Sequence, residues 1–113
     1  MPSDAVIIKV TRAHDVLRCL KFPGPRRSTF ERYTERHQEA HMALEDLGAP
    51  IQETQKVFLF LQGIHYPKLE PAKRVVLQDQ AKLESFLECS RYIALCLGHV
   101  GPPQDSEDED SSA

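Results

Sequence analysis

The stretch of residues 28–47 constrains the fold more than any other, because its apolar residues recur at steps of three and four. This spacing places them on one narrow stripe of an α-helix, while charged side chains and glutamine cover the other sides. The stripe consists of Phe30, Tyr33, His37, Ala40, Leu44 and Leu47. The sequence therefore predicts a helix over residues 28–47 whose stripe packs against the rest of the chain.

Both ends of this stretch carry the signals of a helix start and a helix stop. Ser28 and Glu31 have the spacing of a capping box, in which a hydroxyl and a carboxylate each accept a hydrogen bond from a free backbone N–H. Gly48 stands where a left-handed residue would close the helix, and Pro50 blocks its continuation. The ends therefore support the same helix as the stripe.

Four further segments with helical spacing are predicted as partners of this stripe. Residues 51–63 are the most apolar and should lie at the core centre. Pro71 suits the first turn of a short helix, and Asp79 suits the cap of a helix over residues 80–97 that ends at Gly98. In residues 4–21, β-branched side chains also suit a short strand. A helix is favoured there, because no second strand is predicted to pair with it.

These segments together predict an all-α fold, a small bundle of four or five helices. Residues 1–27 form a basic N-terminal arm with a helix and a proline-rich loop, residues 28–97 form the helical domain, and residues 98–113 form a disordered acidic tail. Replacing Phe58 or Leu61 with alanine should unfold the domain. The candidate core residues are Phe30, Tyr33, His37, Leu44, Leu47, Val57, Phe58, Leu61, Phe86 and Ile93.

The length and the cysteine content limit the class of protein. At 113 residues the chain has room for one domain at most. No apolar run approaches the ~20 residues of a membrane span, and the first residues are too interrupted for a secretory signal. The three cysteines, Cys19, Cys89 and Cys96, are too sparse for a disulfide framework. We therefore expect an intracellular, cytoplasmic protein with free thiols and no membrane segment.

Charge is distributed unevenly along the chain. Residues 1–27 carry six basic and two acidic side chains, whereas residues 105–113 carry five acids and no base. A basic arm can contact the phosphates of a nucleic acid such as RNA. Few aromatic residues are interleaved with these cations, so a solvated basic face stays open as the alternative. The candidate nucleic-acid contacts are Lys9, Arg12, Arg18, Lys21, Arg26 and Arg27.

The motifs of known catalytic and metal sites are missing. His37 and His41 stand one helical turn apart, a spacing that can share a metal ion, but the zinc-protease pattern needs a glutamate where this chain has Gln38. His37 also belongs to the apolar stripe, so packing histidines are favoured over a metal site. The sequence has no Gly-x-Ser-x-Gly elbow and no glycine-rich phosphate loop. We therefore expect no enzymatic activity, no cofactor and no small-molecule substrate.

Short motifs follow one another in a fixed order over residues 24–97. The series comprises Phe30-Glu31-x-Tyr33, His37, His41, Leu44-x-x-Leu47-Gly48, the phrase KVxxFLxGI that begins at Lys56, Pro67-x-Leu69, Ala72-Lys73, Val75-Val76-Leu77, Lys82-Leu83 and Phe86-x-x-Cys89. In this order the motifs resemble the Gag polyprotein of copia-type LTR retrotransposons, particularly those of algae and protists.

The resemblance implies a helical, capsid-like segment. Gag of that family self-associates into a shell and packages the RNA of the element. The family's zinc knuckle, C-x2-C-x4-H-x4-C, is missing from this sequence, so we expect a truncated, degenerate or host-adopted remnant. The leading hypothesis is a non-enzymatic, Gag-like interaction module that self-associates. The alternative is a nucleic-acid-binding accessory protein that acts through the basic arm.

Overall fold

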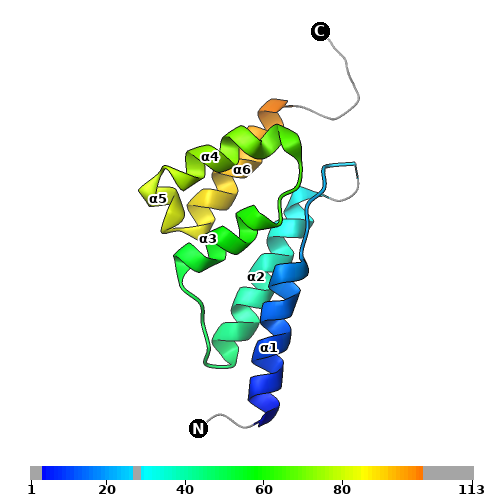
Figure 1. Cartoon of the computed structure of the whole chain (residues 1–113), viewed down its shortest axis with the longest axis vertical. Coiled ribbons are helices and arrows are strands. Elements are labelled where there is room, and N and C mark those ends of the chain that lie inside the picture. The colour runs from blue at the N-terminus through cyan, green and yellow to red at the C-terminus, as the bar shows by residue number, and fades with distance from the viewer. Residues whose placement is uncertain (1–3, 27–28, 101–113) are drawn as a thin grey trace.

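The computed structural model describes residues 4–26 and 29–100, and within these residues the chain is all-α (Figure 1). The helices are α1 (Asp4–Cys19), α2 (Phe30–Asp46), α3 (Glu53–Gln62), a short 3-10 helix η1 (Pro67–Leu69), α4 (Glu70–Leu77), α5 (Gln80–Leu83) and α6 (Phe86–Val100). The predicted fold class is confirmed, although the described residues form six α-helices rather than four or five. The predicted acidic tail lies outside the described residues from residue 101 onward.

Helices α1 and α2 pack side by side in opposite directions and form a long hairpin (Figure 1). Helix α3 contacts both of them and also contacts α5 and α6. Helices α4, α5 and α6 gather at one end of the hairpin, beside the connection between α1 and α2. The other end of the hairpin, which holds the start of α1, projects beyond this group of helices.

Helix α2 begins and ends at residues that form local hydrogen bonds. The hydroxyl of Thr29 accepts a hydrogen bond from the backbone N–H of Arg32 at 3.1 Å, so Thr29 is the N-cap. The capping role predicted for Ser28 lies outside the described residues. Gly48 adopts a φ of 78°. The N–H of Gly48 donates a hydrogen bond to the carbonyl of Glu45, and the N–H of Ala49 donates to the carbonyl of Leu44. These bonds form a Schellman motif, which confirms the predicted stop at Gly48.

The helix predicted over residues 80–97 is interrupted, which corrects the sequence-based prediction. Asp79 caps α5 as expected, since its carboxylate accepts from the N–H groups of Ala81 and Lys82. Helix α5 ends at Leu83, and α6 begins at Phe86 and continues through Gly98 to Val100. Gly98 therefore does not end the helix.

Two side chains stabilise the restart of the chain as α6. The hydroxyl of Ser85 accepts a hydrogen bond from the N–H of Glu88 at 3.2 Å. The carboxylate of Glu53, at the start of α3, accepts from the N–H of Phe86 at 2.9 Å. These acceptors satisfy N–H groups that have no partner inside the first turn of a helix. Ser85 and Glu88 have the spacing of a capping box, and the contact from Glu53 is visible only in three dimensions.

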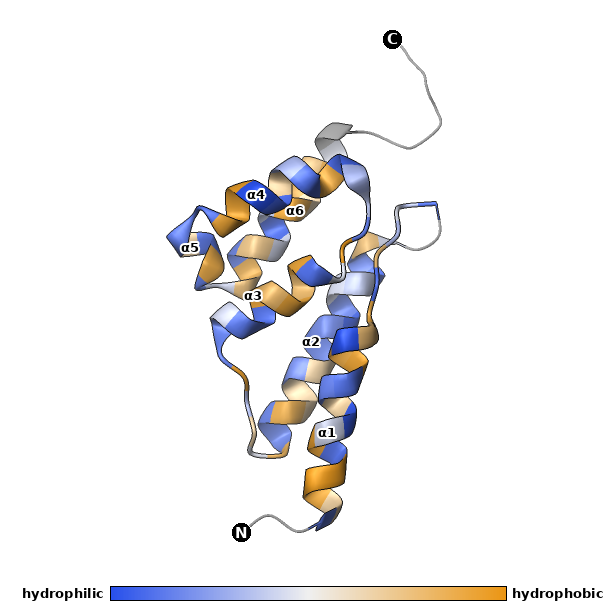
Figure 2. Cartoon of the chain, in the orientation of Figure 1, coloured by the Kyte–Doolittle hydropathy of each residue, from blue (hydrophilic) through white to orange (hydrophobic). Residues whose placement is uncertain are grey.

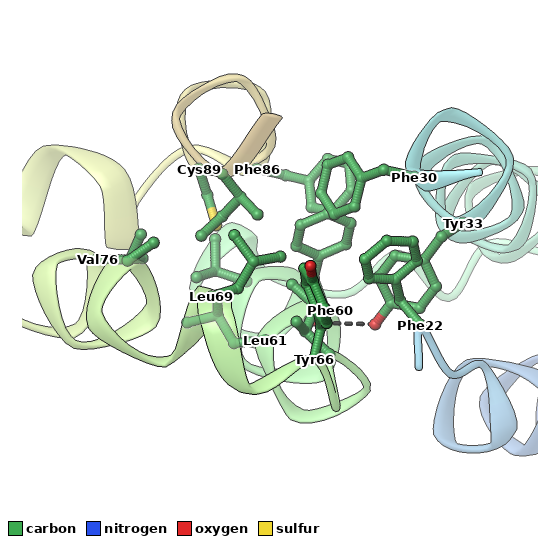
Figure 3. Packing of buried hydrophobic residues seen from close by; sticks show 14 residues of the cluster. Phe22, Phe30, Tyr33, Phe60, Leu61, Tyr66, Leu69, Val76, Phe86 and Cys89 are labelled. Carbon is green, nitrogen blue, oxygen red and sulfur yellow. Dashed lines mark hydrogen bonds between the residues drawn. The ribbon is translucent and has the colours of Figure 1, made fainter. Parts of the chain in front are cut away.

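The core is an aromatic cluster between α2, α3 and α6 (Figure 3). The ring of Phe60 from α3 lies between those of Phe30 and Phe86, with centroids 5.6 Å and 5.0 Å away. Phe22, at the start of the predicted proline-rich loop, was not predicted to lie in the core but is fully buried in this cluster. Of the ten candidate core residues eight are buried, Leu47 is half-buried and Phe58 is exposed.

The prediction that Phe58 lies in the core is wrong. Its side chain is 52 % exposed, whereas that of Phe60, two residues later, is fully buried. The buried positions Val57, Phe60, Leu61 and Ile64 repeat at steps of three and four, and Phe58 lies about 100° round the helix from Val57. Because five consecutive residues of α3 are apolar, the sequence pattern leaves the direction of its buried face open.

We therefore expect Phe60→Ala and Phe58→Ala to differ strongly in stability. Phe60→Ala should lower the free energy of unfolding by about 3–5 kcal/mol, because it opens a cavity at the centre of the aromatic cluster. Phe58→Ala should change it by less than about 1 kcal/mol, because half of this side chain already contacts water. Chemical denaturation followed by circular dichroism measures both values, and similar losses would contradict the packing described.

Candidate functional site

The six basic residues predicted to contact nucleic acid do not form one surface. Lys9 and Arg12 line a groove near the projecting end of the hairpin, and Lys21 lines a different groove at the other end of α1. Arg18 pairs with Asp15 of its own helix at 2.5 Å. Arg26 is exposed in the loop after α1. Arg27 lies outside the described residues.

Two arginines of α2 that the sequence analysis did not select complete the groove at Lys21. This cationic groove encloses about 350 Å³ between the end of α1 and the first turns of α2. Arg32 and Arg36 stand four residues apart and so project from the same side of α2. No acidic residue is among the groove's lining residues, which are Cys19, Leu20, Lys21, Arg32, Tyr33 and Arg36.

The charges of the cationic groove are only weakly neutralised. Arg32 lies 3.8 Å from the carboxylate of Glu35, and both side chains are more than half exposed. Lys21 donates to the carbonyl oxygen of Arg18 at 3.2 Å, and no carboxylate of the described residues forms an ion pair with it. Arg36 forms no ion pair with any described residue. Three cations around one hollow suit an anionic group, because guanidinium and ammonium groups both donate hydrogen bonds to phosphate or carboxylate oxygens.

A second groove, which we name the apolar groove, runs between α1 and the end of α2. It encloses about 440 Å³. Lys9 and Arg12 of α1 stand on one rim, and Asp46 of α2 stands on the other. The remaining lining residues are Ala13, Val16, Ala43 and Leu47.

Apolar side chains remain exposed along α1. Ile7 and Ile8 near its start and Val16 in its last turn are each about half exposed. Figure 2 shows the corresponding hydrophobic segment at the free end of α1. Exposed apolar surface of this kind in a small domain is typical of protein–protein contacts. The apolar groove is therefore the candidate site for a contact with another protein surface.

The two histidines of α2 face the aromatic cluster. The ring of His37 lies 4.7 Å from that of Tyr33 and 5.2 Å from that of Phe60, between centroids. The ring of His41 stacks edge-on against that of Phe86 at 4.7 Å. Both nitrogens of His37 and Nε2 of His41 are buried without a hydrogen-bond partner. These imidazoles pack in the core as apolar rings do.

Burial makes both imidazoles hard to protonate. Loss of solvation, together with a smaller effect of the nearby His41, lowers the pKa of His37 to about 3. Loss of solvation and the charge of Lys56, partly opposed by Glu53, lower the pKa of His41 to about 4. Both histidines are therefore neutral in the folded protein at physiological pH.

The remaining His, Cys, Asp and Glu side chains do not assemble into a metal centre among the described residues. No three His, Cys, Asp or Glu side chains there lie close enough together to hold a metal ion. All three cysteines are free thiols, and burial raises the pKa of Cys89 to about 12, which keeps its thiol protonated. None of the described helices combines the length and the apolar character needed to cross a membrane.

Comparisons of the chain with protein-family models, with curated proteins and with solved structures find no match. The resemblance to Gag of copia-type retrotransposons therefore stays a prediction from the sequence motifs.

The buried histidines predict a loss of stability in acid. Below about pH 6.5 the unfolded chain binds a proton at each histidine, whereas the folded chain does not until the pH approaches 4 for His41 and 3 for His37. The free energy of unfolding should thus fall by about 1.4 kcal/mol per pH unit for each histidine between these limits. Urea denaturation at a series of pH values from 7 to 4 measures this slope.

A substitution separates this effect from the titration of surface carboxylates. His37→Phe should remove about half of the histidine contribution to the slope, because the aromatic ring remains and its protonation is lost. The exposed His65→Gln is the matched control and should leave the slope unchanged. If the free energy of unfolding depends on pH with the same slope in wild type and His37→Phe, the buried His37 does not cause the loss of stability in acid.

Proposed function

We propose that this chain is a non-enzymatic, Gag-like and capsid-like helical interaction module, derived from a retrotransposon, that self-associates through the apolar groove. The observation that carries the proposal is the groove itself, in which Val16 remains half exposed between two helices of the hairpin. The ordered motifs over residues 24–97 support the Gag-like origin. Three cysteines that all remain free thiols are in keeping with an intracellular, cytoplasmic location.

The charges around the apolar groove favour a second copy of this chain as the partner. Lys9 and Arg12 line one rim, and Asp46 lines the other. In a two-fold contact the same patch of each copy faces the other copy in the opposite direction. Each Asp46 would then lie opposite Lys9 and Arg12 of the second copy. The small side chains of Ala13 and Ala43, which line the groove, would allow the two hairpins to approach closely.

A carboxylate placed in the apolar groove should abolish self-association. We expect Val16→Glu to be monomeric, since the new charge would lose its hydration on contact and would also repel Asp46. Met42→Glu is the matched control, because Met42 is exposed on α2 outside the groove lining. Light scattering over a dilution series measures the dimer fraction, and circular dichroism checks that both variants fold.

Two results would count against this proposal. A wild-type chain that remains strictly monomeric at high concentration would exclude self-association. Equal loss of dimer in Val16→Glu and Met42→Glu would place the contact elsewhere on the molecule.

Nucleic-acid binding is the second candidate function, and we propose the cationic groove rather than the whole basic arm as its site. Lys21, Arg32 and Arg36 converge on this groove from two sides, the end of α1 and the first turns of α2. A phosphate backbone carries closely spaced anionic groups that the ammonium and guanidinium groups of this groove can bind. Such binding would depend strongly on salt.

Removing two of these cations should weaken RNA binding and its salt dependence. For the double variant Lys21→Gln with Arg36→Gln, the slope of log affinity against log salt should decrease by about 1–2, because each phosphate that is no longer neutralised lowers the slope by about one. Lys9→Gln with Arg12→Gln removes the same charge from the apolar groove and should change the slope little. Fluorescence anisotropy with a labelled single-stranded RNA measures both slopes. Equal slopes in the two double variants would contradict the assignment of RNA binding to the cationic groove.

A further inference from the structure

We propose that the acidic segment of residues 105–110 of this same chain docks on the cationic groove and competes there with external anions. The segment contains Asp105, Glu107, Asp108, Glu109 and Asp110, and no basic residue follows it. The groove presents three cations and no acidic lining residue. The two sets of charges are therefore complementary, and both belong to one molecule.

The position of α6 brings the segment within reach of the groove. Ser90 and Ala94 of α6 share a surface hollow with Phe30 and Thr34 at the start of α2. From Ala94 to Val100, α6 advances about 9 Å, and a helix is about 10–12 Å across with its side chains. The ten residues that follow Val100 can extend to about 35 Å. This length is enough to pass around the start of α2 to its other side, where Arg32 and Arg36 lie.

Figure 1 supports the same route. The end of α6 and the connection between α1 and α2 lie at the same end of the molecule. The cationic groove is formed by the residues next to this connection, namely the end of α1 with Lys21 and the first turns of α2. The acidic segment thus starts from the end of the molecule that carries the groove.

Tethering makes a weak contact effective. A short flexible linker gives an effective concentration in the millimolar range, so an affinity that is negligible between separate molecules can occupy the groove about half of the time. The attraction is electrostatic between solvent-exposed groups, and salt should therefore weaken it. A groove that is occupied half of the time would bind an external anion about twofold more weakly than an empty one.

Cys19 supplies a direct reporter of the docked state. Its thiol is exposed and lines the cationic groove, whereas Cys89 is buried and Cys96 is half-buried. A docked segment would cover the thiol and so slow its reaction with a reagent in solution. Alkylation by the neutral reagent iodoacetamide, quantified for each cysteine by mass spectrometry, measures this shielding without any added nucleic acid.

The test compares the full chain with a variant in which the five acids of residues 105–110 are replaced by the corresponding amides. We expect Cys19 to react two- to threefold faster in the variant at about 20 mM salt, where screening is weak, and at the same rate in both chains at about 1 M salt. Equal rates at low salt would overturn the proposal. A rate difference that depends on protein concentration would also overturn it, because it would place the contact between molecules.

Groove variants show whether the segment acts at this site. In a background with Arg32→Gln and Arg36→Gln, neutralising the tail should no longer accelerate the reaction of Cys19. In the matched background with Lys9→Gln and Arg12→Gln, the two- to threefold acceleration should persist. If neutralising the tail accelerates the reaction of Cys19 in both backgrounds, the segment does not dock on the cationic groove.

Discussion

The close approach of three chain segments at Gly63 is the constraint on which the rest of the structure depends. A Cβ atom at this position would collide with the hydroxyl of Tyr33 and with the carbonyl oxygen of Leu20. Only glycine leaves room for this approach. Beside it, Tyr33 donates a hydrogen bond to the carbonyl of Phe60, and the N–H of Phe22 donates to the carbonyl of Gly63 at 2.8 Å. The ends of α1 and α3 are thereby fixed against the start of α2 (Figure 3).

This junction also determines where the two grooves lie. Because it holds the end of α1 against the first turns of α2, it places Lys21 beside Arg32 and Arg36. At the opposite end, α1 and α2 extend beyond the helices that cover the junction, so the apolar groove remains uncovered. One packing arrangement thus produces two grooves, one cationic and one more apolar, which suit different partners. The two grooves share none of their described lining residues, so substitutions can test each one separately.

The buried histidines show how the same core limits the conditions under which the protein is folded. His37 and His41 fill positions next to Phe60 and Phe86 without forming hydrogen bonds through their buried nitrogens. Neutral imidazoles fit the packing there, but charged ones would lose their hydration on burial. The stripe on α2 therefore combines dense aromatic packing with sensitivity to acid, and an all-phenylalanine stripe would have only the first of these properties.

The sequence by itself determined the helical segments and several of their ends, because periodicity, the Asp79 cap and the stop at Gly48 depend on neighbouring residues. It also identified Lys21 but not its partners Arg32 and Arg36, since their positions on α2 indicate only a solvated face. Tertiary structure alone decided that Phe60 rather than Phe58 is buried, that Phe22 enters the core, and that Glu53 caps the restart of α6. Each of these outcomes depends on segments that are distant in the sequence and that only tertiary packing brings together.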